Sequence, residues 1–276
     1  MSERVKIILD KNADILRLPA IALRGLVVFP GNIIHFEVGR KKSIAAIEWA
    51  MSNNNAVFLT AQQDMDVEDP GFKDLYAYGV VAEVKQVLRV SDELVKVLVE
   101  GKYRAKLLTL DSSGRFLLAS TKAAALRGTK SVDSARVEAL VRSVKEAFEE
   151  YLSLNPRLSK DVVYTIITNE DAALLCDYIP ANLLLKYTDK QALLNEGTVS
   201  GRLEKLLEIL RRETKILHIE KDIQSKVNEQ MDKNQRDYYL REQMRAISNE
   251  LDDFDDTREE AEEYKAKIEK TKLPEE

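Results

Sequence analysis

Few residues of the kinds that build catalytic or metal sites occur in this chain, and their spacing does not group them. The candidates are two histidines, His35 and His218, and one cysteine, Cys176. The histidines lack the spacing of zinc ligands, and a single cysteine excludes an internal disulfide. Cys176 lies in an apolar helical pattern, which favours a buried small side chain over a reactive thiol. We therefore expect no metal site in this chain.

The motifs of phosphate binding and of serine hydrolases are absent from the sequence. Residues 128–131 (GTKS) lack the adjacent Gly-Lys pair and the upstream glycine of a phosphate-binding loop. No Gly-x-Ser-x-Gly elbow occurs. We expect no catalytic residue and no bound cofactor here. Three bases at 40–42 precede an expected helix, where they oppose its dipole. They are either ordinary solvated bases or the mark of a ligand or partner charge.

Four apolar residues are candidates for contact with an apolar peptide: Phe29, Pro30, Ile33 and Trp49. The first three precede or begin an expected strand, and Trp49 points away from the buried stripe of an expected helix at 42–51. Each has a structural alternative. Phe29 and Ile33 fit core packing, and Trp49 fits the cover of a second apolar surface of the domain.

The elements that would position these residues predict an α+β protein. Residues 18–120 are β-rich, with alternation at 34, 36 and 38, and with two strands at 80–90 and 94–99 around a turn. They predict a mostly antiparallel, curled sheet. From 131 onward the apolar period is helical, which predicts a bundle of short helices. Ser159 and Asn169 are expected helix caps, and Thr188 with Gln191 has the spacing of a capping box.

A long helix is expected from Val199 to Phe254, because no glycine or proline occurs between Gly201 and Pro274. Its apolar stripe fades over the polar residues 228–237 and then resumes with the alternating spacing of a coiled coil. Neighbouring tyrosines 238 and 239 cannot both lie on that stripe. The candidates for contacts between subunits or domains are Tyr238, Tyr239, Leu240, Met244, Ile247 and Leu251.

Length and charge limit the class of protein. The 276 residues suit more than one domain, and we expect divisions at 1–121, 131–227 and 228–276. The net charge of −5 is uneven, since residues 251–276 hold eleven acids and five bases, a net of −6, which leaves +1 for the remainder. A near-neutral body does not favour nucleic-acid or membrane binding. No secretion signal or membrane-length apolar run is present, which predicts a cytoplasmic protein.

Several stretches resemble the amino-terminal region of Lon proteases. They are residues 18–31 (LPAIALRGLVVFPG), 38–51, 79–84 (GVVAEV) and 95–105, followed by residues 235–247 (QRDYYLREQMRAI) of the connecting helix. The resemblance covers nearly the whole chain, with the elements in order. It implies a PUA-like β-rich domain, then a helical bundle and a long helix.

In that family this region helps to select unfolded or tagged proteins and supports a hexamer. The AAA+ module, which uses ATP and Mg²⁺, and the Ser-Lys dyad would lie beyond residue 276, so the resemblance implies a fragment. Two alternatives stay open. One is a stand-alone adaptor with a Lon-type domain, against which the long helix argues. The other is a PUA-like RNA-binding protein, which the near-neutral body makes less favourable.

Overall fold

The computed structural model of the chain describes residues 15–270, except 92, 129–133 and 156–157, and it describes no side chains at 134 and 250–259. Contacts divide the chain into two compact units, residues 1–215 and 216–276. The three-part division expected from the sequence stays a prediction. Among the helices described, none is both long and apolar enough to cross a membrane.

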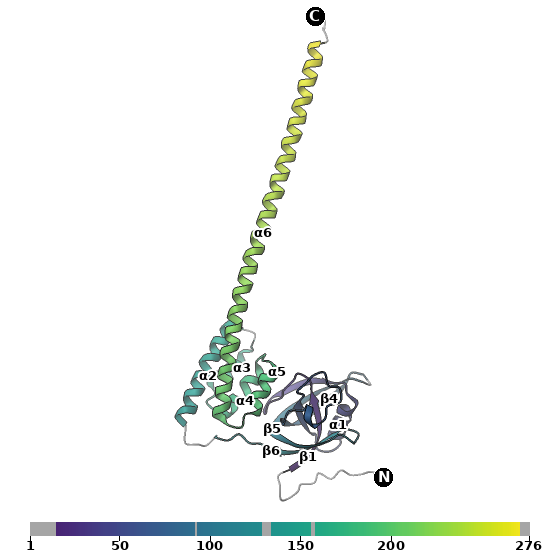
Figure 1. The fold of residues 1–276 in the computed structure, drawn as a ribbon, viewed down its shortest axis with the longest axis vertical. Coiled ribbons are helices and arrows are strands. Elements are labelled where there is room, and N and C mark those ends of the chain that lie inside the picture. The colour runs from purple at the N-terminus through teal and green to yellow at the C-terminus, as the bar shows by residue number, and fades with distance from the viewer. Residues whose placement is uncertain (1–14, 92, 129–133, 156–157, 271–276) are drawn as a thin grey trace. The chain divides into compact units, whose positions relative to one another are not determined.

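Six strands form one sheet that closes on itself. They are β1 (Ile15–Leu23), β2 (Ile33–Val38), β3 (Ala56–Ala61), β4 (Tyr78–Arg89), β5 (Val95–Asp111) and β6 (Leu117–Ala123). Their order is β2-β5-β4-β3-β1-β6, and β5 also pairs with β6, so all strands except β2 close a small barrel (Figure 1). Among these strands β1 and β3 are the one parallel pair. The sequence-based α+β class and the mostly antiparallel sheet are confirmed.

One edge of β5 serves two strands, and this arrangement leaves a gap in the barrel wall. β2 pairs with the first part of β5, from Val95 to Glu100, and β6 pairs with the last part. β6 in turn pairs with β1 only from Ile15 to Ala20. The end of β1, residues 21–23, therefore has no strand on that side, and the outer edge of β2 is open as well.

The loop before β2 is fixed by close packing against Gly101 of β5. The Gly101 amide donates to the Asn32 carbonyl at 2.9 Å, and the Gly31 amide donates to the Gly101 carbonyl at 2.8 Å. A Cβ atom on Gly101 would lie 2.2 Å from the Phe29 carbonyl oxygen, a distance that no side chain tolerates. Gly31 has a φ of 73°, in the left-handed region that favours glycine. This loop thus sets where β2 begins.

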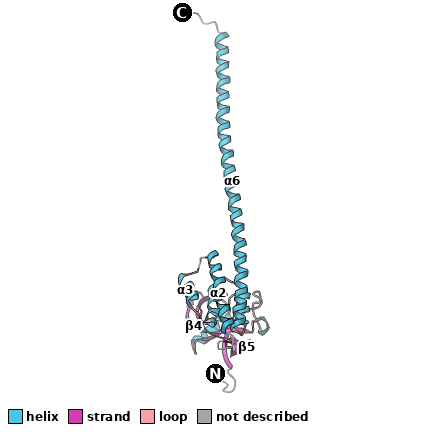
Figure 2. Ribbon diagram, turned by 90° about the vertical axis from the view of Figure 1, so that its left-hand side faces the viewer, coloured by secondary structure: helices cyan, strands magenta, loops and turns pink. Residues whose placement is uncertain are grey.

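One α-helix lies between two strands of the sheet in the sequence, and the other α-helices follow the last strand (Figure 2). α1 (Lys41–Met51) packs its small residues and Ile47 on β1 and β3. The later helices are α2 (Ser134–Leu154), α3 (Lys160–Thr168), α4 (Ala172–Asn182), α5 (Tyr187–Asn195) and α6 (Val199–Lys270), and between β3 and β4 lies a short 3₁₀ turn, η1 (Phe72–Asp74).

Local caps were predicted with mixed success. Ser159 caps α3 as expected, since its side chain accepts from the Val162 amide. The cap of α4 is Asp171 and not Asn169, whose side chain instead accepts from the Asp171 amide. The prediction of a capping box at 188–191 is wrong. α5 follows Lys186 without a side-chain cap, and Gln191 is buried, where it donates to the Tyr78 carbonyl of β4 at 2.9 Å.

A polar cluster of buried and partly buried side chains joins the barrel to the helices of the first unit. We call it the junction: Tyr78, Arg104, Asp177, Gln191 and Arg202. Arg202 of α6 is completely buried, forms an ion pair with Asp177 of α4, and donates from Nε to the Glu196 carbonyl at 3.0 Å. Arg104 of β5 donates to the Asn195 carbonyl at 2.8 Å, and its guanidinium lies 4.2 Å above the Tyr78 ring.

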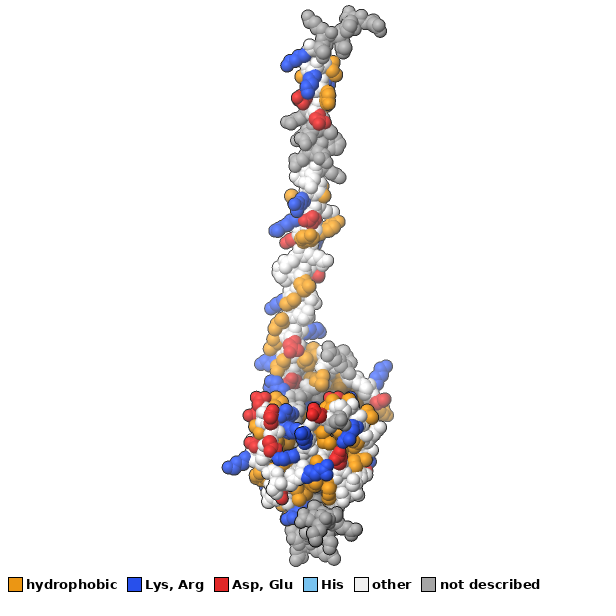
Figure 3. Space-filling model, turned by 90° about the vertical axis from the view of Figure 1, so that its right-hand side faces the viewer, with side chains coloured by type: hydrophobic (Ala, Val, Ile, Leu, Met, Phe, Trp, Pro, Cys, Tyr) orange, Lys and Arg blue, Asp and Glu red, His pale blue; other side chains and the backbone are white. Residues whose placement is uncertain are grey.

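The predicted uninterrupted helix is confirmed and continues to Lys270. In the first unit its stripe of Leu203, Leu206 and Leu210 is fully buried. From residue 216 onward the large apolar side chains whose placement is described are exposed, except the partly buried Leu217, and Figure 3 shows hydrophobic side chains, in orange, at intervals along this helix. The most exposed are Met244 at 72%, Tyr238 at 67% and Tyr264 at 64%.

Candidate functional site

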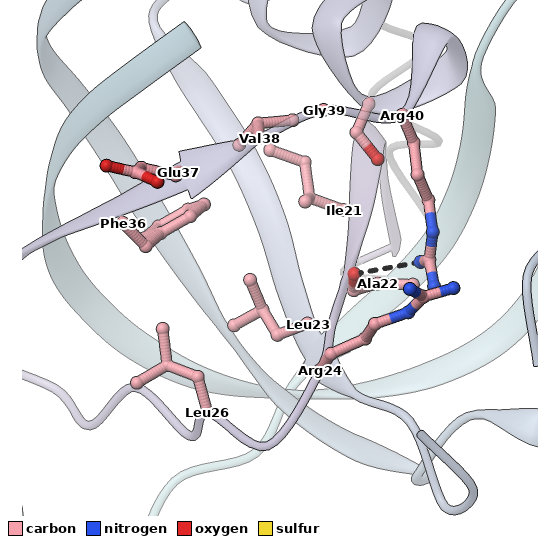
Figure 4. Close-up of a pocket in the computed structure, with 11 residues that line it drawn as sticks. Ile21, Ala22, Leu23, Arg24, Leu26, Phe36, Glu37, Val38, Gly39 and Arg40 are labelled. Atoms are coloured by element: carbon pink, nitrogen blue, oxygen red, sulfur yellow. Dashed lines mark hydrogen bonds between the residues drawn. The ribbon is translucent and has the colours of Figure 1, made fainter. Parts of the chain in front are cut away.

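A groove of about 360 Å³ lies in the gap between the end of β1 and the open edge of β2. Its size falls at the small end of the range of ligand sites in proteins. Figure 4 shows that it is lined by consecutive residues of each segment, from Ile21 to Arg24 and from Phe36 to Arg40, with Leu26 on the connecting loop. The groove therefore follows two segments of backbone and is not a hole between side chains alone.

The middle of the groove is apolar. Ile21, Leu23 and Val38 belong to the buried core, whereas Phe36 and Leu26 are only partly buried. The alternation that predicts strand β2 places Phe36 on its inner face, but no strand covers the ring completely because the wall is open there. Two partly covered large apolar side chains in a concave site can bury an apolar group of a ligand.

Arg40 forms the polar end of the groove. Its guanidinium donates to the Ala22 carbonyl at 3.3 Å, drawn as a dashed line in Figure 4, and to the Val67 carbonyl at 3.1 Å. It also donates to the side-chain oxygen of Gln62, which is fully buried and which donates to the Val67 carbonyl in turn. Burial and then the charge of Arg24 lower the pKa of Arg40, against the opposite effect of Asp69 and Glu68.

Arg24 lies beside Arg40 and shares one acceptor with it. It is exposed, and it donates to the Val67 carbonyl at 3.3 Å. Within the residues that the structure describes, no carboxylate forms an ion pair with either guanidinium, and Asp69 is paired with Lys42. Two positive charges at one end of an apolar groove favour an acidic group on the ligand.

The substrate-binding residues expected from the sequence fall in three different places. Phe29 is completely buried under the Gly101 contact, so its side chain is not available to a ligand in this structure. Pro30 is partly buried, and Ile33 at the start of β2 is 61% exposed. Trp49 is partly buried on α1, with its ring 5.7 Å from that of Phe116. None of the four lines the groove.

The residues expected to make contacts between subunits lie on the second part of α6. Tyr238, Tyr239, Leu240, Met244 and Ile247 are all exposed there, whereas the side chain of Leu251 lies outside the description. Their role stays a prediction.

The sequence interpretation missed Phe36 and Leu26 as site residues. It did single out the bases at 40–42, and Arg40 is the member of that cluster that lines the groove. The other candidates for chemistry lie elsewhere. His35 is exposed on β2, and Cys176 is buried in α4, where its thiol has its pKa raised to about 12 by burial. Among the described residues no group of three histidines, cysteines or acids has the arrangement of a metal site.

Comparisons with known proteins agree with one another. Residues 17–212 match the model of the ATP-dependent protease La (LON) substrate-binding domain. The chain is 39% identical over its full length to a Lon protease of Heliobacterium modesticaldum and covers 33% of that protein. It is 39% identical over 266 residues to the Lon protease of Escherichia coli strain K12, of which it covers 34%. The chain thus spans about a third of the length of these relatives.

The fold agrees with a solved structure. The N-terminal domain of Lon protease from Mycobacterium avium complex superposes with a TM-score of 0.57 at 20% identity, over 71% of this chain and 98% of that one. At this identity the likeness concerns the fold alone. Since the family model covers most of the chain, from β1 through the buried start of α6, the chain belongs to the family of Lon substrate-binding domains.

Proposed function

We propose that this chain is the part of an ATP-dependent Lon protease that binds unfolded or damaged protein substrates, and that the groove between β1 and β2 is its binding site. The observation that carries the proposal is the groove itself, an apolar trough with an open strand edge on one side and two unpaired guanidiniums at one end. The substrate-binding description of the family and the one-third coverage of its relatives support it.

The remaining activities follow from the family and are part of the same proposal. ATP hydrolysis with Mg²⁺ and peptide-bond cleavage belong to modules outside these 276 residues, and the protein acts in the cytoplasm. A single groove of this size should bind an unfolded chain weakly, in the micromolar range or above, and several copies in one assembly would raise the avidity.

A matched pair of variants tests the site. Leu26→Asp introduces a charge on the apolar lining, and Leu88→Asp makes the same change at a side chain on β4 that is 57% exposed and does not line the groove. We expect Leu26→Asp to weaken binding of fluorescein-labelled, unfolded casein about tenfold, since one buried leucine contributes about 1.5–3 kcal/mol. Leu88→Asp should leave the affinity unchanged. Equal losses in both variants would contradict the assignment of the groove.

We also propose that the part of α6 from residue 216 onward supports assembly of several copies of the chain. Its exposed apolar side chains recur at spacings of three and four residues at Ile216, Ile219, Ile223 and Val227, and again at Leu240, Met244 and Ile247. A helix gains most of its stability by packing such a face. Sedimentation velocity across a hundredfold range of concentration should show association that Met244→Asp abolishes. A concentration-independent monomer would contradict this part of the proposal.

A further inference from the structure

The open edge of β2 presents unpaired backbone groups along the groove. In an antiparallel ladder, successive residues point their amide and carbonyl alternately toward and away from the partner strand. The Gly101 amide donates to the Asn32 carbonyl, and the register of β2 with β5 runs without a shift from Ile33 to Val38. Asn32 and the even-numbered residues therefore point toward β5. The amides and carbonyls of Ile33, His35 and Glu37 point to the open edge.

One backbone carbonyl of the opposite wall is already occupied. The Leu23 carbonyl accepts from the Gln62 amide on the β3 side, so by the same alternation Ala22 points its carbonyl into the gap. That carbonyl accepts from the Arg40 guanidinium. For the edge of β2, in contrast, the described residues provide no hydrogen-bond partner at His35 or Glu37. The two walls thus differ: on β1 the Ala22 carbonyl is occupied by Arg40, whereas on β2 the outward carbonyls of His35 and Glu37 have no partner among the described residues.

We infer that the edge of β2 takes up an extended segment of substrate polypeptide as an added strand. Backbone groups of the segment pair with His35 and Glu37, an apolar side chain enters the groove against Phe36 and Leu26, and a neighbouring acidic side chain reaches Arg24 and Arg40. This inference rests on the proposed function, and it adds the mode of binding and the chemistry of the preferred sequence. β-strand addition of this kind gives affinity through the main chain and selectivity through alternate side chains.

The geometry explains why such a site would accept many sequences. β2 has six residues, the length of an ordinary strand, so a segment of similar length can pair along it. Main-chain hydrogen bonds do not depend on the sequence of the segment. Folded proteins compete poorly for the site, because most of their backbone groups are already paired. An unfolded chain has free backbone groups and meets the requirement without further change.

The decisive probe is a set of eight-residue peptides with alternating valine and serine and one aspartate, labelled with fluorescein and titrated into the unmodified chain. N-methylation removes the amide donors of alternate residues without changing the side chains. Since only one set of amides can face β2, methylating that set should weaken binding tenfold or more. Methylating the other set should change it less than twofold. Replacing the aspartate with asparagine should weaken binding severalfold.

Two variants of the protein provide the matching test. His35→Pro removes an edge amide that takes no part in the ladder with β5, and proline is tolerated at strand edges. His35→Ala removes the same exposed side chain and keeps the amide. We expect His35→Pro to bind at least fivefold more weakly than His35→Ala, with the same melting temperature for the two variants. The methylated peptides keep the test valid if the proline variant unfolds.

The outcomes separate the two proposals. Peptide binding that is insensitive to both methylation sets and to His35→Pro, but is lost in Leu26→Asp, overturns strand addition and leaves the groove as the binding site. Binding that is unaffected by Leu26→Asp overturns both. No binding of any peptide to the unmodified chain also overturns both.

Discussion

Two arginines of the first unit, Arg202 in the junction and Arg40 in the groove, are both held by backbone carbonyls, yet they differ in charge balance and in access to water. Arg202 is completely buried, and its charge is matched by Asp177. Burial raises the pKa of the Asp177 carboxyl, and the Arg202 guanidinium opposes that rise. Arg40 is partly buried, has no ion-pair partner among the described residues, and has a second guanidinium beside it.

The difference indicates different roles. A charge that is buried and paired holds elements together, because separating the pair would leave an uncompensated charge inside the protein. A charge that is positioned by carbonyls and left without a carboxylate retains its attraction for an outside group. The junction is therefore a structural connection between the barrel and the helices, and the groove is the surface that we propose as the ligand site.

The largest effect is expected in the junction. Arg202→Met should lower the free energy of unfolding by about 3–5 kcal/mol, since it leaves Asp177 buried without its partner. Lys205→Met is the control, because Lys205 lies on the same helix as Arg202 and forms a more exposed ion pair, with Glu196. This pair should contribute less than about 1 kcal/mol. Urea unfolding followed by circular dichroism measures both. Similar values for the two variants would refute the role given to Arg202.

A smaller loss is expected where the loop before β2 meets β5. Gly101→Ala places a Cβ atom against the Phe29 carbonyl and should cost about 1–3 kcal/mol, as overpacked cores do. Gly114→Ala, in the turn before β6, meets nothing closer than 3.7 Å and should change stability by less than about 1 kcal/mol. The same unfolding measurement distinguishes them. A neutral Gly101→Ala would show that the loop can move away from β5.

In the groove, the effect on stability should be smaller still and the effect on binding larger. Arg40→Met removes hydrogen bonds to two backbone carbonyls and one to the buried Gln62 side chain, so we expect a loss of about 1–2 kcal/mol. Affinity for the aspartate-containing peptide should fall about fivefold and affinity for its asparagine form should not change. A loss of stability as large as that of Arg202→Met would show that Arg40 has mainly a structural role, like Arg202.

The reactivity of cysteine side chains compares how accessible α4, next to the junction, and the groove are to solvent and reagents. Burial raises the pKa of Cys176 to about 12, whereas a thiol in the unfolded chain titrates near 8.5. The unfolded chain therefore loses its proton first as the pH rises, and stability should decline from about pH 8.5 toward 12. At pH 8 iodoacetamide should alkylate native Cys176 at least about a hundredfold more slowly than in urea. Leu26→Cys, made in a Cys176→Ala background, should react quickly in the native state.

Local patterns in the sequence were sufficient for many elements and insufficient for the site. The alternation at 34, 36 and 38, the two strands around residue 92 and the long helix all follow from periods of two and 3.6 residues. The parallel pairing of β1 with β3 and the ion pair of Arg202 with Asp177 join residues far apart in the chain, so no local pattern predicts them. Gln191 shows the same limit, since its spacing suggested a cap and its burial gave it another partner.

The groove could not be predicted from the sequence, because it lies where no strand pairs with the end of β1 or with the outer edge of β2. It exists because β6 covers only the first part of β1 and β2 covers only the first part of β5. Phe36 and Leu26 read as ordinary core residues in the sequence, and only the sheet order shows that their cover is incomplete. The bases at 40–42 were the one local signal of this site.

Hydrogen exchange of the chain with and without saturating unfolded casein shows whether substrate binds in the groove. We expect slower exchange on binding at residues 33–38 and around residues 21–26, with no change at residues 191–202, which include part of the junction. Protection centred on Trp49 and Phe116, or on α6 beyond residue 216, with β2 unchanged, would contradict this expectation.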